Sequence, residues 1–185
     1  MGVAVLALAA PAHALDVKRL EVALQGDRYV VEFNAELDAP ADAVRAVLTD
    51  YAAYPELDPR IKESRVLSRD PDHSVRLYTS MRGCLGGWLC RTMQRVEKVK
   101  ETPDELLATA DLSQSDVLFG LTRSQWQSND HGTQLTYRME IMPKFWIPPL
   151  FGPGLMISAL RSGTLELFTN VEKAARERSE KVATQ

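Results

Sequence analysis

The order of extended and helical segments restricts the fold of this chain more than any other feature of its sequence. Extended segments fill most of residues 17–142, two short helical segments interrupt them early, and one long helical segment follows at residues 154–177. The segment 29–37 has the pattern of a half-buried strand, because polar residues alternate with apolar ones that share one face. These apolar residues are Tyr29, Val31, Phe33, Ala35 and Leu37. Strands followed by one long helix are typical of the α+β class.

The same patterns predict eight strands, with two short helices between the second and third of them. A helix begins at Pro40, since proline suits the first turn, and ends near Asp50. A second short helical turn ends by Pro59. The third strand alternates weakly, which is typical of a sheet edge. The predicted strands are residues 17–24, 29–37, 61–68, 75–81, 88–99, 106–112, 117–127 and 135–141.

The predicted strand 117–127 has apolar residues of both parities. Its first half is apolar at odd positions up to Leu121, whereas Trp126 has an even position. A β-bulge near Gly120 would reconcile the two halves, because one extra residue switches the face of a strand. Arg123 is thereby left ambiguous between the inner and the outer surface.

Composition and charge fit one globular domain and exclude several classes. A chain of 185 residues is one domain at roughly 150 residues per domain. Its 45% hydrophobic and 25% charged residues exclude disorder, collagen and coiled coil as the main architecture. The net charge of −3 argues against a nucleic-acid partner, which requires a strongly basic face. Three histidines and two cysteines leave little material for a zinc site or a histidine-based active site.

The N-terminal segment has the features of an export signal. Residues 3–10 are apolar or small, Pro11 interrupts them, and Ala12-His13-Ala14 matches the small-x-small pattern of a signal-peptidase site. We expect residues 1–14 to be a signal peptide, truncated at its start because no basic residue precedes the apolar run. The alternative is an apolar tail on a cytoplasmic protein.

The two cysteines are predicted to form a disulfide. Cys84 and Cys90 flank a glycine pair, which is a signal for a hairpin turn. A three-residue loop at residues 86–88 would set the two cysteines directly opposite each other, with Cα atoms about 4.5 Å apart, at the short end of the disulfide range. An oxidising compartment favours this bond. The alternative is two free buried thiols; a metal site lacks a second ligand pair, and nucleophilic catalysis lacks a neighbouring base.

Two short sequences carry a resemblance to a known family. Asp50-Tyr51-Ala52-Ala53-Tyr54-Pro55 is followed by Ile61-Lys62-Glu63-Ser64-Arg65-Val66-Leu67, and then by Trp126, a turn at Gly132-Thr133 and a proline-aromatic loop before the last helix. In these features the chain resembles the polyketide cyclase/dehydrase and coenzyme-Q-binding branch of the START-like (SRPBCC) superfamily. The resemblance covers residues 24–178.

This resemblance implies the helix-grip fold. In that fold a curved antiparallel sheet wraps around the long C-terminal helix, two short helices follow the first strands, and an apolar cavity lies inside. We expect the START-like ligand-binding domain at residues 15–178 and a polar tail at residues 179–185. The export signal and the cysteine pair depart from the usual cytosolic or mitochondrial members.

Few residues indicate catalysis. His73 and His131 lie in polar turns and are expected to be solvated, and Asp50 suits a helix end better than a catalytic carboxylate. Nucleophile-elbow, zinc-protease and phosphate-loop motifs do not occur, so we predict no catalytic residue, metal or cofactor. Arg123 is a candidate partner for an anionic headgroup if it faces the cavity. The other strand arginines are expected to face water: Arg82, Arg91, Arg95 and Arg138.

Large, deformable apolar side chains favour a site for a hydrophobic ligand, since methionine adapts to flexible ligands. The alternative is that these side chains pack a solid core. The candidate ligand-binding residues are Phe33, Leu77, Met81, Met93, Leu121, Arg123, Trp126, Tyr137, Met139, Trp146, Leu155, Met156 and Leu160. Residues of the same type nearby are Trp88, Met142 and Phe145.

The sequence therefore predicts a periplasmic or secreted protein that holds a lipid, an isoprenoid quinone or a polycyclic compound for transport or sequestration. One alternative is an aromatase/cyclase-type enzyme, favoured if Asp50, Arg123 and Tyr137 converge in one pocket. Another is a protein-interaction module, favoured if the core is filled.

The loop before the last helix has two interpretations. Prolines keep it out of both sheet and helix, yet most of its side chains are large and apolar. It either plugs the cavity or forms an exposed lip that contacts a membrane transiently, because tryptophan is favoured at membrane interfaces. Its residues are Phe145, Trp146, Ile147, Pro148, Pro149, Leu150 and Phe151.

Overall fold

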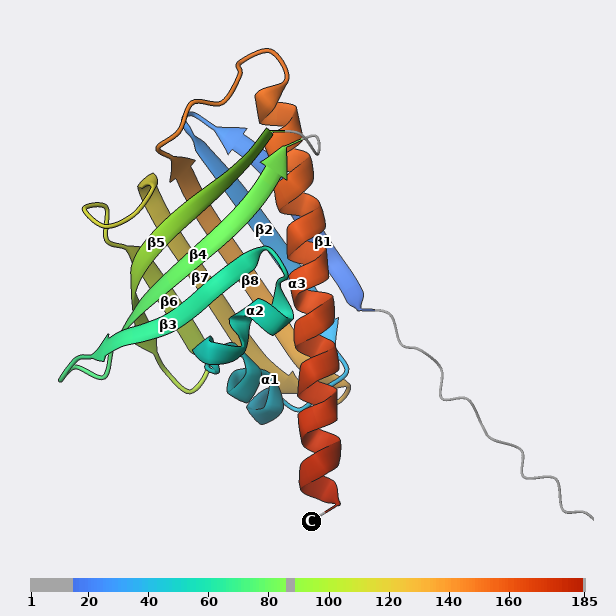
Figure 1. The fold of residues 1–185 in the computed structure, drawn as a ribbon. Coiled ribbons are helices and arrows are strands. Elements are labelled where there is room, and N and C mark those ends of the chain that lie inside the picture. Colours follow the sequence, from blue (N-terminus) through green and yellow to red (C-terminus); the bar gives the residue numbers. More distant parts are fainter. Residues whose placement is uncertain (1–14, 86–88, 185) are drawn as a thin grey trace, which may run out of the picture.

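A curved antiparallel sheet wraps around one long helix in the computed structural model, which describes residues 15–85 and 89–184 (Figure 1). The eight strands follow one another in the sheet as β1-β2-β8-β7-β6-β5-β4-β3. In chain order they are β1 (Asp16–Gln25), β2 (Arg28–Leu37), β3 (Ile61–Arg69), β4 (Val75–Leu85), β5 (Leu89–Glu101), β6 (Glu105–Ala110), β7 (Val117–Asn129) and β8 (Gly132–Pro143). The predicted edge position of the third strand is confirmed.

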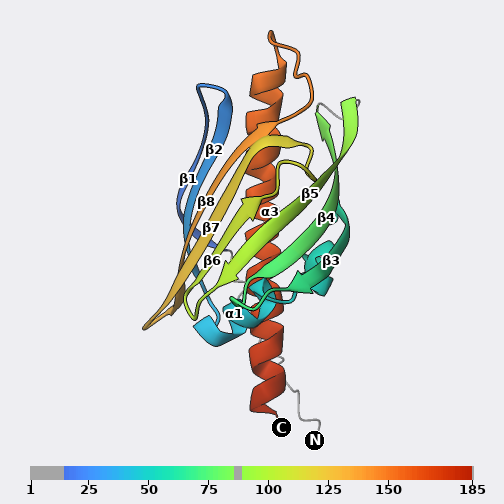
Figure 2. The ribbon, with the colours of Figure 1, turned by 90° about the vertical axis from the view of Figure 1, so that its left-hand side faces the viewer.

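The helices lie on the concave side of the sheet. Helix α1 (Ala41–Leu48), a 3-10 turn (Tyr51–Ala53) and helix α2 (Tyr54–Leu57) form a short connection between β2 and β3. Helix α3 (Gly152–Ala183) runs along the inside of the sheet, as the turned view shows (Figure 2). The predicted α+β class and helix-grip architecture are confirmed.

The core forms where β2 and β8 meet helix α3. The apolar face of β2 is buried as its alternation predicts. The Phe33 ring stacks on Phe168 of helix α3 with ring centroids 4.8 Å apart, and the Tyr137 ring meets Phe168 edge-on at 5.0 Å. Such aromatic pairs add about 0.5–1.5 kcal/mol beyond their burial. This cluster packs the middle of helix α3 against the sheet.

The bulge in β7 lies earlier than predicted. Val117 pairs with Pro143 and Phe119 with Met142, so the extra residue is Leu118 and not Gly120. The face therefore switches before residue 119, and even-numbered residues from Gly120 to Trp126 point inward. This corrects the placement of Leu121 and Arg123, which fall on the outer face.

Helix α3 is longer at both ends than the predicted residues 154–177. It begins at Gly152 and ends at Ala183, so most of the segment predicted as a polar tail is helical. The C-terminal extension, residues 178–183, has no proline or glycine and is rich in good helix formers. Arg178 anchors it by donating to the Ala46 carbonyl oxygen and pairing with Asp50.

The predicted disulfide is confirmed. Cys84 is directly opposite Cys90 in the ladder between β4 and β5, and a disulfide joins them across a Cα separation of 3.9 Å. The turn between them, residues 86–88, lies outside the described residues, and with it Trp88. The bond closes the tip of the hairpin at the end of the sheet where helix α3 begins (Figure 1).

Candidate functional site

An internal cavity of about 210 Å³ separates the inner face of the sheet from helix α3. We call it the inner cavity. Leu48 of α1, Leu57 of α2, Met81 of β4 and Met93 of β5 are among its lining residues. Its lining is mainly apolar, as the position between two apolar faces requires. A filled core would favour the interaction-module alternative, and this space does not favour it.

A second hollow of about 430 Å³ adjoins the inner cavity. We call it the mouth cavity, and Cys84, Phe145, Trp146 and Met156 are among its lining residues. Both hollows are lined by the same five residues at their junction: Arg60, Met81, Met93, Ile141 and Leu160. Together they extend from α2 to the loop before helix α3.

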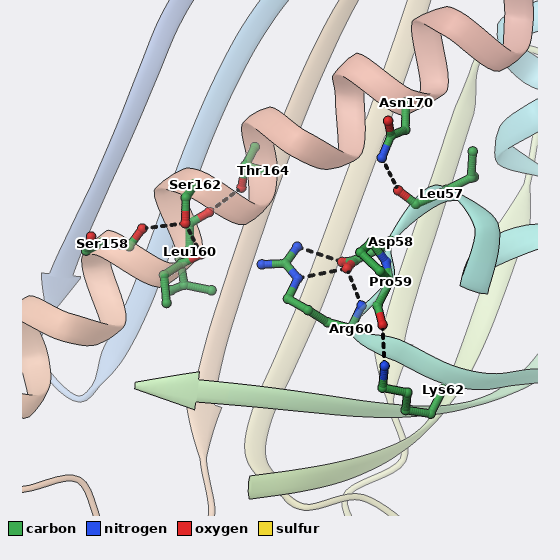
Figure 3. Close-up of polar contacts among 11 residues, drawn as sticks. Leu57, Asp58, Pro59, Arg60, Lys62, Ser158, Leu160, Ser162, Thr164 and Asn170 are labelled. Atoms are coloured by element: carbon green, nitrogen blue, oxygen red, sulfur yellow. Dashed lines mark hydrogen bonds and ion pairs between the residues drawn. The ribbon is translucent and has the colours of Figure 1, made fainter. Parts of the chain in front are cut away.

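Arg60 stands at this junction. Its Nε and Nη2 donate to the Asp58 carboxylate at 2.8 and 2.6 Å, and Asp58 is buried. Figure 3 shows the guanidinium turned toward helix α3. A Cβ added at Gly163 would lie 1.8 Å from Arg60 Nη1, so the helix has no side chain where the guanidinium packs. The hydroxyls of Ser162 and Thr164 bond to carbonyl oxygens of their own helix.

A polar group lies inside the inner cavity. Arg95 and Glu97 on β5 form an ion pair, with Nη2 and Oε2 3.3 Å apart, and the Glu97 side chain is only 5% exposed. Burial raises the pKa of Tyr137 to about 12, an effect that Arg95 opposes and Glu97 increases. Burial, with a contribution from Glu97, also raises the pKa of Tyr54 above its usual range. Both phenols are therefore protonated at neutral pH.

This polar group was not predicted from the sequence, and the prediction that Arg95 faces water was wrong, because Arg95 lines the inner cavity. A signal was present in the parity of β5. Met93, Arg95, Glu97 and Val99 alternate onto one face, and all four line the cavity. Met93 and Val99, at the two ends of this row, are apolar and indicate that the row faces the core. Arg95 and Glu97 lie between them with the same parity, so their side chains point in the same direction.

Nine of the candidate ligand-binding residues line the two hollows. In the inner cavity these are Leu77, Met81, Met93, Tyr137, Met139 and Leu160. In the mouth cavity they are Met81, Met93, Trp146, Leu155, Met156 and Leu160.

Four candidates do not line either hollow. The Phe33 ring packs in the aromatic cluster with helix α3. Trp126 is buried, and its indole N–H donates to the Pro103 carbonyl oxygen. Leu121 and Arg123 point outward because the bulge lies at Leu118. Arg123 is exposed and pairs with Glu105, so it cannot meet a ligand headgroup inside the cavity.

The convergence that would favour the catalytic alternative does not occur. Tyr137 lines the inner cavity, whereas Asp50 pairs with Arg178 and Arg123 lies outside. His73 and His131 are exposed in turns. In residues 15–85 and 89–184 no cluster of three or more histidine, cysteine or acidic side chains could hold a metal ion.

The loop before helix α3 divides its apolar side chains between two sides. Ile147 packs against a buried cluster, and Phe145 lines the mouth cavity. Trp146 also lines the mouth cavity but is 73% exposed, and two further exposed side chains of this segment do not line it: Leu150, 93% exposed, and Phe151, 46% exposed. We call these three residues the lip. No helix within the described ranges is long and apolar enough to cross a membrane.

A curved antiparallel sheet that grips one long helix over an internal apolar hollow defines the helix-grip class of the START-like superfamily. The chain belongs to the polyketide cyclase/dehydrase and lipid transport family, whose sequence model matches residues 37–164. The resemblance seen in the sequence is thus confirmed. No curated protein is detectably similar in sequence.

Several solved structures have the same fold. The Zhui aromatase/cyclase from Streptomyces sp. R1128 is similar with a TM-score of 0.63 and 15% identity, over 80% of this chain and 94% of that chain. Human STARD10 has a TM-score of 0.64 and 15% identity, over 93% and 77%. The STAR-related lipid transfer protein from Xanthomonas axonopodis has a TM-score of 0.58 and 18% identity, over 85% and 98%. At these identities the likeness shows the fold alone.

Proposed function

We propose that this protein is an exported carrier that holds a hydrophobic ligand in the two adjoining hollows and exchanges it with a membrane at the lip. The observation that carries this proposal is the continuity of an apolar interior with an exposed apolar loop. Membership of a family that includes lipid transport, and the likeness to STARD10 and to the Xanthomonas lipid transfer protein, support it. The ligand class is a lipid, an isoprenoid quinone or a polycyclic compound.

Ligand binding is tested with a neutral fluorescent probe such as N-phenyl-1-naphthylamine. The native protein should bind it saturably, and a lipid extract should displace it. Leu160→Arg should weaken probe binding, because Leu160 lines both hollows and a charge there is costly in an apolar space. The matched control is Leu118→Arg, whose side chain is exposed at the bulge of β7. A probe signal that appears only on unfolding would contradict the carrier function.

Export is supported by the position of the fold within the chain. β1 begins at Asp16, two residues beyond Ala14, the last residue of the predicted signal. Cleavage there would leave the whole sheet and the disulfide in the mature protein. Mass spectrometry of the exported protein should find Leu15 as its first residue, whereas an intact N-terminus in the cytoplasm would contradict export.

Membrane contact is supported by the exposure of the lip. A cluster of exposed apolar side chains is typical of an interaction surface, and the indole of tryptophan suits the bilayer interface. Lys144 and Arg91 are exposed near the same end, which favours anionic lipids. A contact here would let a lipid pass between the bilayer and the mouth cavity without crossing water.

The lip is tested through the fluorescence of Trp146 in a Trp88→Phe/Trp126→Phe variant. Its spectrum should shift to the blue with vesicles of phosphatidylglycerol and phosphatidylcholine, and Trp146→Ser should slow ligand transfer between vesicles. The control is Leu112→Ser, which changes another exposed apolar side chain away from the lip. An unchanged Trp146 spectrum at saturating lipid would contradict membrane docking.

The aromatase/cyclase alternative keeps one supporting observation. Two phenols and an ion pair lie within a mainly apolar space, and the Zhui aromatase/cyclase has a similar fold. Mass analysis of a bound polyketide before and after incubation separates the two functions. A carrier releases its ligand chemically unchanged, whereas an enzyme releases a dehydrated or cyclised product.

A further inference from the structure

Arg91 is a cation in the wall of the mouth cavity with which no carboxylate of the described residues pairs. Its guanidinium lies over the Phe145 ring, 5.7 Å from the ring centroid, and makes no hydrogen bond or ion pair within the described ranges. Because the side chain is exposed although it lines the cavity, it stands at the rim. A guanidinium has five N–H donors in a planar fork, so Arg91 still has donors for a ligand group.

The hairpin of β4 and β5 directs Arg91 toward the cavity. Arg91 has the same parity in β5 as Met93, which lines both hollows. The ladder register places Arg82 of β4 on the opposite face, and Arg82 lines neither hollow. The disulfide between Cys84 and Cys90 ties the backbone just before Arg91 to the neighbouring strand. The position of this cation at the rim is therefore fixed by register and by a covalent bond.

The charged groups deeper in the protein have the opposite balance. Arg95 pairs with Glu97, and Arg60 pairs with Asp58. The hydrogen bond to Asp58 raises the pKa of Arg60 above its ordinary value, and Glu166 of helix α3 lies near enough to raise it further. These groups comprise three carboxylates and two guanidinium groups, so the interior and the junction have an excess of one negative charge.

This distribution of charge orients an amphiphilic ligand. An anionic headgroup in the inner cavity would lose its water and meet the excess negative charge, which is costly. At the rim the same headgroup stays partly hydrated and accepts hydrogen bonds from the Arg91 fork, which matches the oxygens of a carboxylate or a phosphate. An ammonium headgroup would be repelled there. The apolar chain can extend inward past Met93 and Leu160, which line both hollows.

We propose that the ligand is an amphiphile with an anionic headgroup, a carboxylate or a phosphate, which Arg91 binds at the rim of the mouth cavity while the apolar chain lies inward. This inference rests on the proposed carrier function and names the ligand class of its site. It also gives transfer a direction. The chain enters the protein first, and the headgroup stays beside the lip, at the level where bilayer headgroups lie.

The test measures displacement of the neutral probe N-phenyl-1-naphthylamine without vesicles, so that attraction to an anionic bilayer does not contribute. Dodecanoate, dodecyl phosphate and 1-dodecanol have the same chain and differ in their headgroups. In Arg91→Gln the Kd of both anions should rise about fivefold or more, as expected for a lost hydrogen bond between charged groups, whereas the Kd of 1-dodecanol should stay unchanged. Inorganic phosphate alone should not displace the probe, because it has no apolar chain.

Two further variants assign the effect to the position and the charge of Arg91. Arg82→Gln is the matched control, since it makes the same change in an arginine of the same hairpin that lines neither hollow, and it should leave all the Kd values unchanged. Arg91→Glu reverses the charge at the rim. It should weaken dodecanoate further and bind dodecyltrimethylammonium more tightly than the native protein does, an exchange that a damaged hairpin would not produce.

The outcomes separate this inference from the carrier function. If Arg91→Gln weakens dodecanoate and 1-dodecanol equally, or weakens neither, the headgroup site is overturned and the carrier function stays in place. An equal loss of dodecanoate affinity in Arg82→Gln also overturns it, because the effect would then come from the general charge of the hairpin. Displacement of the probe by inorganic phosphate alone overturns the amphiphile in favour of a free anion. Absence of probe binding in the native protein overturns both proposals.

Discussion

Replacing Gly163 with alanine should destabilise the protein, although the same change inside most helices is stabilising. Alanine is favoured over glycine in a helix interior by about 1 kcal/mol. At this position, however, the new Cβ would lie 1.8 Å from Nη1 of Arg60 and 2.4 Å from both Cζ and Nη2. Non-bonded heavy atoms separate to roughly 3.5–4.0 Å, so the guanidinium must move by about 1.5–2 Å.

That movement breaks at least one bond to Asp58. The two side-chain hydrogen bonds have lengths of 2.8 and 2.6 Å, and a shift of this size takes one of them beyond hydrogen-bonding distance. A hydrogen bond to a charged group contributes about 1.5–3 kcal/mol, and the helix gain offsets about 1 kcal/mol of this loss. The net effect should be a destabilisation of about 0.5–2 kcal/mol.

Urea unfolding in two backgrounds tests this reasoning. In an Arg60→Ala background the clash is absent, so Gly163→Ala should stabilise by about 1 kcal/mol and the sign should reverse. Gly154→Ala in the same helix is a control, since its Cβ would meet no atom within 4 Å. Stabilisation by Gly163→Ala in the otherwise native protein would refute the packing of Arg60 on helix α3.

Three further predictions concern stability. The unreduced protein should show no reactive thiol, and reduction of the Cys84–Cys90 bond should lower the free energy of unfolding by about 2–2.5 kcal/mol, from its seven-residue ring; an unchanged urea midpoint after reduction would contradict this. Gly132→Ala should cost about 3 kcal/mol, because its Cβ would lie 2.2 Å from a backbone oxygen at a φ of +133°, and a native-like midpoint would refute it. Hydrogen bonds, of which the one from the Ser74 hydroxyl contributes most, hold the pKa of the Asp72 carboxyl below its usual range. The charged carboxylate therefore stabilises the folded state at neutral pH, and this stabilisation is lost as the pH falls below about 4. Asp72→Asn should therefore flatten the fall in urea midpoint between neutral and acidic pH, and equal slopes in both proteins would count against it.

Local patterns in the sequence were sufficient for the elements and their approximate order. The alternation in β2 predicted its buried face, because in a strand with one face in the core and the other in water, apolar and polar residues alternate with a period of two. The spacing of Cys84 and Cys90 predicted their pairing, since a hairpin register depends on the few residues of its own turn. These features are decided within about ten residues of chain, and a single sequence records them.

The placement of Arg123 depended on information that no local pattern holds. Its face is fixed by the bulge at Leu118, and that bulge is defined by how β7 pairs with β8. The apolar side chains on both parities of β7 were compatible with a switch at several positions. Only the pairing selects one of them, and the bulge at Leu118 places Leu121 and Arg123 on the outer face.

The wrong prediction for Arg95 has a different cause, because its charge predicts a side chain in water whereas its parity in β5 predicts one on the inner face. A charged strand residue usually faces water, but here Met93 and Val99 show that the row faces inward. The interior accepts Arg95 because Glu97, two residues away on the same face, pairs with it. A spacing of two residues within one strand is thus itself a signal for a buried ion pair.

Stability alone does not account for this pair. Burying two charges costs several kcal/mol per ion before their attraction is counted, and replacing such a pair by apolar residues of similar volume is often neutral or stabilising. Glu97 adds a further cost, since one of its oxygens has no partner. The position of this ion pair in the lining of a mainly apolar space therefore favours a role in the cavity over a role in folding.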